Sequence, residues 1–219
     1  MELIGLAALG GGLALDGTSV GQFMLSRPLV AGTITGWLLG DPATGFLLGA
    51  VLEMYLLVSF PTGGARFPEG ATATVVAVSC ASFAVGPGSL PLAAAAGLLW
   101  GQVGGLSITG LRKLNGHLVP EPFEPGIRPA RVVRAQAAGV VLDFLRGSIV
   151  TLAGVAIGRP VVAYLSGSWP MGPAESLALV LLGAAVSTGI LLRDFGGFRS
   201  RRFLFVAGFA LGVLGMRFL

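Results

Sequence analysis

The chain has 219 residues, of which 54% are hydrophobic and 11% are charged, and its formal net charge is +4. Soluble domains carry about a quarter charged residues, so this composition excludes an ordinary soluble protein and indicates an integral membrane protein. One histidine and one cysteine exclude a His/Cys metal cluster and an intrachain disulfide, and the sequence contains no P-loop for ATP. We therefore expect no metal and no cofactor, and the basic residues are expected to orient the protein in the membrane rather than to bind nucleic acid.

Apolar stretches recur along the chain, which predicts an all-α, polytopic transmembrane helix bundle forming a single membrane domain over residues 1–219. A helix needs about 20 residues to cross the hydrocarbon, so the shorter stretches predict short, broken or re-entrant helices. The first stretch has no basic leader, and we expect it to be retained. The predicted segments are 3–15, 23–40, 45–60, 71–86, 90–111, 135–165, 174–192 and 203–219.

Glycine is frequent, with 36 residues, and in places it recurs every four positions. Small residues at this spacing let membrane helices approach closely, so they predict packing stripes. The two clearest sets are Gly32, Gly36 and Gly40, and Gly97, Gly101 and Gly105.

Polar residues gather just before and at the start of the second segment, 23–40. Asp16 and Gln22 precede it, and Arg27 and Pro28 stand at its beginning. An arginine at this position can extend to the membrane interface. These residues do not establish a site by themselves.

The third segment carries a carboxylate on a face of small residues. Gly45, Gly49 and Glu53 recur every four residues and therefore share one face of the predicted helix. An ionised carboxylate in hydrocarbon costs at least about 2.5 kcal/mol, so Glu53 must pair, accept hydrogen bonds or be protonated. Two interpretations are open: a ligand for sugar hydroxyls, or a buried ion pair or capped structural residue. Asp41, directly before Pro42, is expected to cap the helix.

An irregular stretch, PTGGARFPEG at residues 61–70, follows at once. Short apolar segments interrupted by glycine and proline indicate a transport site, because irregular backbone at membrane depth survives only where protein or a cavity satisfies its polar groups. We therefore expect this break to line a cavity. Its carboxylate, Glu69, is either a ligand or a solvated loop residue paired with Arg66.

Two basic stretches, 112–134 and 193–202, are predicted to be cytoplasmic loops. The two crossings predicted between them keep both on the same side. Asp143 and Arg146 are three residues apart on a predicted helix and are expected to pair with each other. His117 lies among the basic residues and is expected to be solvated.

The run SRPLVAGTITGWLLGDPATGFLLGAVLEMYLL, continued by TGGARFPEG, resembles the membrane subunit IIC of the mannose/fructose/sorbose family of the bacterial sugar phosphotransferase system. The ordered pattern is Arg-Pro, Gly-Asp, Thr-Gly, Gly and Leu-Glu, and it covers residues from about 16 to 75. The remainder of the chain agrees in length, hydropathy and layout.

The resemblance implies a sugar-translocating subunit with no phosphorylated or catalytic residue of its own. Such a subunit works with a second membrane subunit, IID, and with IIA and IIB phosphocarrier proteins, of which IIB phosphorylates the hexose, amino sugar or ketose. The resemblance also implies a multi-pass protein of the bacterial cytoplasmic (inner) membrane, an elevator-like displacement of a core region, and a trimer of IIC/IID pairs.

Carrying the family's site over to the matching positions gives two sets of residues. The residues expected to line the sugar path are Glu53, Glu69, Gly63 and Gly64, with Asp16 and Gln22 added. The residues expected to have structural or gating roles are Arg27, Pro28, Asp41, Gly45, Gly49, Arg66 and Pro68. Relatives often have Pro-Pro-Asp where this chain has Phe67, Pro68 and Glu69, and this longer carboxylate leaves the sugar's identity open.

Two alternative functions remain. The chain could keep the fold but serve as a regulatory membrane scaffold for phosphotransferase proteins without moving sugar. It could also be an unrelated ion-coupled carrier in which Glu53 titrates, which would take up unmodified substrate in a pH-dependent way.

Overall fold

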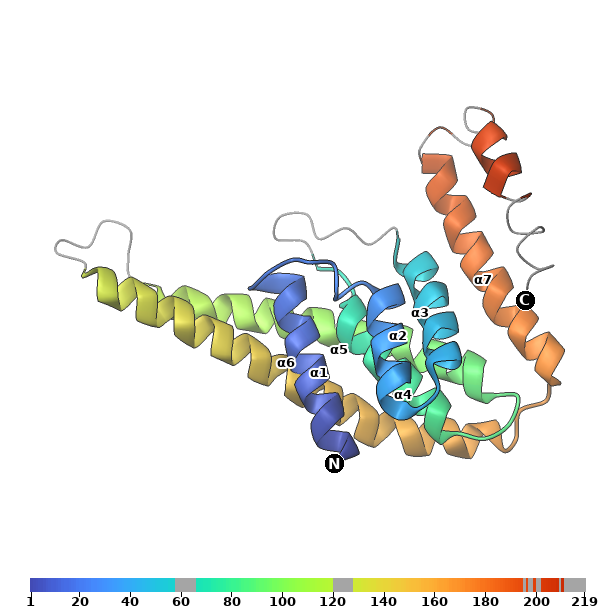
Figure 1. Cartoon of the computed structure of the whole chain (residues 1–219), viewed down its shortest axis with the longest axis horizontal. Coiled ribbons are helices and arrows are strands. Elements are labelled where there is room, and N and C mark those ends of the chain that lie inside the picture. Colours follow the sequence, from blue (N-terminus) through green and yellow to red (C-terminus); the bar gives the residue numbers. More distant parts are fainter. Residues whose placement is uncertain are drawn as a thin grey trace.

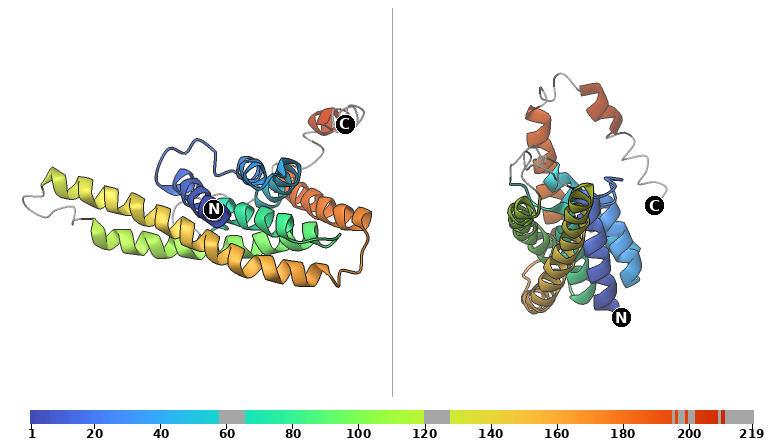
Figure 2. Two further views of the ribbon diagram at one scale, coloured as in Figure 1. Left: turned by 60° about the horizontal axis from the view of Figure 1, so that its bottom comes forward. Right: turned by 90° about the vertical axis from the view of Figure 1, so that its left-hand side faces the viewer.

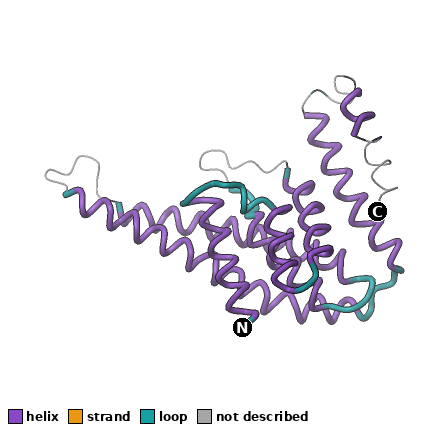
Figure 3. The backbone as a smooth tube through the Cα atoms, in the orientation of Figure 1, coloured by secondary structure: helices purple, strands orange, loops and turns teal. Residues whose placement is uncertain are grey.

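The computed structural model describes residues 1–57, 66–119 and 128–194, together with 196, 199, 202–208 and 210. All regular structure in these residues is helical, which confirms the predicted all-α class (Figure 3). Residues 202–208 are also helical. The labelled helices are α1 (Glu2–Thr18), α2 (Pro28–Leu39), α3 (Pro42–Leu56), α4 (Gly70–Phe83), α5 (Ser89–Leu118), α6 (Pro129–Ser166) and α7 (Pro173–Asp194).

The two longest helices, α5 and α6, run side by side along the long axis of the molecule (Figures 1 and 2). Helices α1, α3 and α4 pack against this pair, and α2 packs against α1, α3 and α4. Helix α7 lies at the end of the molecule opposite the carboxyl end of α5 and the amino end of α6. It contacts α3 and α5. Among the described residues, three helices, α5, α6 and α7, are long and apolar enough to cross a membrane. Helices α2, α3 and α4 are apolar but shorter, as the short segments predicted.

Helices α2 and α3 form a hairpin through their glycines. A Cβ added at Gly32 would lie 2.5 Å from the carbonyl oxygen of Gly45, so the two helices touch backbone to backbone. Gly40 ends α2 at φ 83°, a conformation that favours glycine, and Asp41 caps α3 by accepting the N–H of Thr44 at 3.0 Å. The cap is confirmed, and so is the packing stripe at Gly32 and Gly36, whereas a Cβ at Gly40 would meet nothing within 4 Å.

Helix α4 lies in the core. Residues 71–81 of this helix are all buried, including Cys80. The second glycine stripe lies against α4: a Cβ at Gly97 would come within 2.7 Å of Ala77 Cβ, and one at Gly101 within 3.2 Å of Ala73 Cβ. This close approach brings the start of α4 against α5.

The basic stretch 112–134 is not a continuous loop, which corrects the prediction. Helix α5 continues to Leu118 and α6 begins at Pro129, so His117 lies in the last turn of α5, although it is exposed as expected. Arginine and lysine are good helix formers, and proline is favoured in the first turn, so a charged stretch need not end a helix. In the stretch 193–202, likewise, α7 includes Asp194.

Candidate functional site

Two adjoining cavities lie where the carboxyl end of α1 meets the amino ends of α2 and α4. The inner cavity has a volume of about 150 Å³ and the outer about 510 Å³. The inner cavity is lined by Glu53, Glu69, Pro28 and Pro68, among others. The outer cavity is lined by Asp16, Gln22, Arg112 and Asn115, among others. The wall shared by both includes Thr18, Ser26, Arg27 and Phe67.

Glu53 reaches the inner cavity from α3 and is paired. Its Oε1 lies 3.1 Å from Nε of Arg27, and its Oε2 accepts the N–H of Leu29 at 3.3 Å. The Glu53 side chain is 18% exposed and that of Arg27 is 49% exposed. The ion pair expected as one interpretation of Glu53 is therefore present, and it lies at a cavity that a ligand could enter.

Glu69 stands at the amino end of α4 and is buried. Arg146 of α6 binds it through two parallel contacts, Nη1 to Oε2 at 3.0 Å and Nη2 to Oε1 at 2.7 Å, and the Thr72 hydroxyl donates to Oε2 at 2.8 Å. The backbone N–H of Glu69 also donates to the Gly101 carbonyl at 2.8 Å. A solvated Glu69 paired with Arg66 is thus wrong, since Arg66 is exposed and Glu69 belongs to an internal network.

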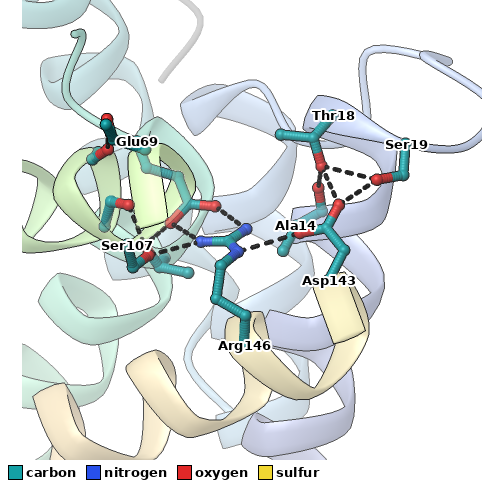
Figure 4. Close-up of polar contacts among 11 residues, drawn as sticks. Ala14, Thr18, Ser19, Glu69, Ser107, Asp143 and Arg146 are labelled. Atoms are coloured by element: carbon teal, nitrogen blue, oxygen red, sulfur yellow. Dashed lines mark hydrogen bonds and ion pairs between the residues drawn. The ribbon is translucent and has the colours of Figure 1, made fainter. Parts of the chain in front are cut away.

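Arg146 is the centre of that network, which Figure 4 shows. Its Nε binds Asp143 Oδ1 at 3.0 Å, which confirms the pair expected from their spacing, and its Nη1 donates to Ser107 Oγ at 2.9 Å. The hydroxyls of Thr18 and Ser19 donate to Oδ2 of Asp143. The network therefore ties α1, α4, α5 and α6 together beside the inner cavity.

Asp16 holds the segment between α1 and α2. Its carboxylate accepts the backbone N–H groups of Phe23 at 2.6 Å and Ser26 at 2.8 Å. In this segment Gln22 and Met24 have positive φ values of 56° and 66°, which are strained for residues other than glycine. Gln22 is exposed at the outer cavity, whereas each oxygen of Asp16 accepts one backbone N–H.

The glycines predicted for the site do not line the two cavities in the described part of the chain. Gly45 and Gly49 pack against α2, where a Cβ at Gly49 would lie 2.6 Å from the carbonyl oxygen of Pro28. Gly63 and Gly64 lie outside the described residues. In the described part of the chain, no group of three or more His, Cys, Asp or Glu side chains is arranged to hold a metal ion.

Sequence reasoning missed Arg146 as a partner of Glu69, and it missed Thr18, Arg112 and Asn115 as lining residues. One signal for the first was available, because a buried charge in a membrane segment requires a partner. Nothing in the spacing identified which of the distant charges would meet.

Comparison with known proteins shows which protein family this chain matches. The family described as "PTS system sorbose-specific iic component" matches residues 1–214. The chain belongs to this family. It is thus a multi-pass membrane component, EIIC, of the mannose/sorbose family of phosphotransferase systems.

Individual relatives match a shorter region. A sorbose-specific EIIC component of Klebsiella pneumoniae is 37% identical over 89 residues, covering 38% of this chain and 34% of the relative. A mannose-specific EIIC component of Escherichia coli (strain K12) is 36% identical over 89 residues, with the same coverage. The matched part spans about a third of the length of these curated relatives.

A solved structure described as "Structure of membrane protein" has the same fold. Its TM-score is 0.71 at 20% sequence identity, and the match covers 99% of this chain and 91% of that chain. At this identity the likeness concerns the fold alone.

Proposed function

We propose that this EIIC chain is the sugar-translocating membrane subunit of its phosphotransferase system. It takes up a hexose, amino sugar or ketose that a separate IIB subunit phosphorylates. The observation that carries the proposal is that Glu53 and Glu69 line one cavity while keeping acceptor positions unused.

The count of hydrogen bonds supports a polyol ligand. An ionised carboxylate has about four acceptor positions, two on each oxygen. Among the described residues, each oxygen of Glu53 meets one donor, and Oε1 of Glu69 meets only Arg146. A sugar offers many hydroxyl donors and no charge, so it can use these positions without breaking either ion pair.

The burial of both carboxylates supports the same ligand class. Glu69 is 5% exposed and the Glu53 side chain is 18% exposed, so hydrogen bonds to them form largely away from bulk water. Small-molecule sites commonly have volumes of about 300–1,000 Å³, and the inner and outer cavities together fall in this range.

The partners are proposed from the family. They are a IID membrane subunit and the IIA and IIB phosphocarriers, with IIC/IID pairs assembled as a trimer in the bacterial cytoplasmic membrane. The curated relatives carry the names of two different sugars, sorbose and mannose, so the substrate class is proposed and the individual sugar is left to experiment.

The test uses membranes that contain this chain with IID, IIB and IIA. Phosphate transfer is measured to a panel of hexoses, amino sugars and ketoses, with Glu53→Gln as the variant and Glu175→Gln as the control, because Glu175 is exposed at the start of α7. We expect sugar phosphate only when all subunits are present. Glu53→Gln should lower kcat/KM by about tenfold or more, as expected for loss of a charged hydrogen-bond partner, while the control is unchanged.

Each other outcome has a definite meaning. Unchanged transfer in Glu53→Gln shows that the site is assigned wrongly. No product with any sugar, from an assembled complex with phosphorylated IIB, favours a scaffold. Uptake of unmodified sugar that depends on pH favours an ion-coupled carrier.

A further inference from the structure

The outer cavity differs from the inner one because its lining includes unneutralised positive charge. Arg112, on α5, is exposed, and its guanidinium lies 5.7 Å from the centre of the Phe67 ring. No carboxylate among the described residues pairs with it. Arg27 also lines this cavity, and its ion pair with Glu53 uses Nε, so within the described part of the chain the two Nη groups of its planar fork are available.

A third group in the same wall lacks a partner. Oδ1 of Asn115 is buried and accepts no hydrogen bond in the described structure. Buried polar atoms are nearly always paired, so an orphaned one at a cavity indicates a missing ligand or water. Asn115 lies three residues after Arg112 on α5, so both side chains fall on the same side of the helix.

Asp16, a carboxylate in the wall of the outer cavity, would repel a bound anion, and the direction of its oxygens reduces that repulsion. Asp16 lines the outer cavity, but its oxygens accept the N–H groups of Phe23 and Ser26. These neutral N–H donors hold the carboxylate oxygens toward the backbone, but they leave the negative charge of Asp16 in place. At the outer cavity the two arginines, Arg27 and Arg112, outnumber Asp16, whereas at the inner cavity Glu53 and Glu69 outnumber Arg27.

We propose that the outer cavity binds the phosphate monoester of the sugar product while the sugar ring occupies the inner cavity. The inference rests on the proposed function and adds a second subsite to it. Guanidinium groups bind phosphate oxygens through paired, charge-assisted hydrogen bonds, and Asn115 Oδ1 accepts a sugar hydroxyl or a bridging water. The same residues, among them Thr18, Arg27 and Phe67, line both cavities, so the two subsites are adjacent, as a sugar phosphate that contacts both requires.

The position of the outer cavity agrees with this ligand. Arg112 begins the basic stretch that is expected on the cytoplasmic side, where a phosphorylated sugar is released. A phosphate at this subsite would hold the product at the face where it leaves. Phosphate chemistry is shared by phospholipid headgroups, and the experiment must separate the two sources.

The test measures binding to the purified full-length chain, co-purified with its IID subunit, in phosphatidylcholine nanodiscs. The probes are mannose, mannose 6-phosphate, sorbose, sorbose 1-phosphate and inorganic phosphate, titrated by calorimetry at low and high salt. The variant is Arg112→Gln, and the matched control is Arg134→Gln, an exposed arginine of α6 that lines neither cavity. Thermal unfolding of each protein checks that it is folded.

We expect a sugar phosphate to bind about tenfold more tightly than its parent sugar. Arg112→Gln should abolish this preference without weakening the parent sugar, Arg134→Gln should retain it, and added salt should reduce it. The same preference in Arg112→Gln overturns the inference, as does equal binding of sugar and sugar phosphate. In the latter case the proposed function stands, because the sugar still binds.

The remaining outcomes are equally decisive. Binding of none of the probes overturns the subsite, and the phosphate-transfer assay then decides the proposed function independently. Nanodiscs with added phosphatidylglycerol test the lipid source. If Arg112→Gln changes only the association with phosphatidylglycerol, the subsite holds a lipid headgroup and the inference is wrong.

Discussion

Replacing Arg146 by methionine should destabilise the protein strongly, because it leaves two carboxylates buried without their cation. The methionine keeps most of the aliphatic stem, so the change removes charge and hydrogen bonds rather than volume. Arg146 is 9% exposed in its side chain, Asp143 is fully buried and Glu69 is 5% exposed, so water cannot replace the lost contacts. Removing one partner of such a buried pair costs about 3–5 kcal/mol.

Arg159→Met is the matched control. Arg159 pairs with Glu2, whose side chain is 53% exposed, and such pairs contribute about 0–1 kcal/mol. Arg159 also donates to Ser79 Oγ at 2.8 Å and lies over the Phe83 ring, so we expect a total loss of about 1–2 kcal/mol.

The assay is reversible unfolding in mixed detergent micelles, followed by tryptophan fluorescence. Arg146→Met should lose at least twice as much stability as Arg159→Met. Adding Glu69→Gln to Arg146→Met should recover part of the loss, since one buried charge is then gone. Equal losses in the two arginine variants, or no recovery on adding Glu69→Gln, would refute the argument that an unpaired buried charge dominates.

Three further predictions concern packing and capping. Gly105→Ala should destabilise the protein, because the added Cβ collides with the backbone carbonyl of Phe67. Gly116→Ala, on the same helix, adds a Cβ that meets nothing within 4 Å, so it should stabilise the protein by about 0.5–1 kcal/mol. Thermal unfolding of the two variants tests this difference. Asp41→Ala should cost about 1 kcal/mol in the same measurement through loss of the α3 cap, and an unchanged midpoint would contradict that role. Cys80 should resist maleimide in the folded protein and react with it after unfolding, as detected by mass spectrometry. Rapid labelling of the folded protein would show that α4 is not in the core.

Local patterns were sufficient for much of the fold. The glycine spacing predicted packing stripes without naming the partner helix, and Gly32 and Gly36 lie against α3, while the Asp-Pro dipeptide predicted the cap at Asp41. Asp143 and Arg146 are one helical turn apart, so their pairing follows from helix geometry. Helix ends in the basic stretches were not predictable in this way, because charge indicates sidedness and does not by itself break a helix.

The candidate site was predictable as a set of residues but not as a network. Glu53, Glu69, Asp16 and Gln22 lie at adjoining cavities, as a shared path requires. Their ligand role stays a prediction. Arg146 is 77 residues from Glu69, and only the packing of α4 and α5 against α6 brings the two together.

The two carboxylates of the inner cavity differ in how freely they can rearrange around the proposed sugar. The pair between Glu53 and Arg27 is partly exposed, and such pairs contribute about 0–1 kcal/mol, so a ligand can replace this contact at little cost. Glu69 is held by both Nη groups of Arg146, and separating them would leave buried charges that hydroxyl donors only partly satisfy. Glu69 can therefore offer a sugar only its unused acceptor position, in a fixed direction. Adaptation to different sugars is then expected at the contact between Glu53 and Arg27, because the Arg27 side chain is 49% exposed and can take another position.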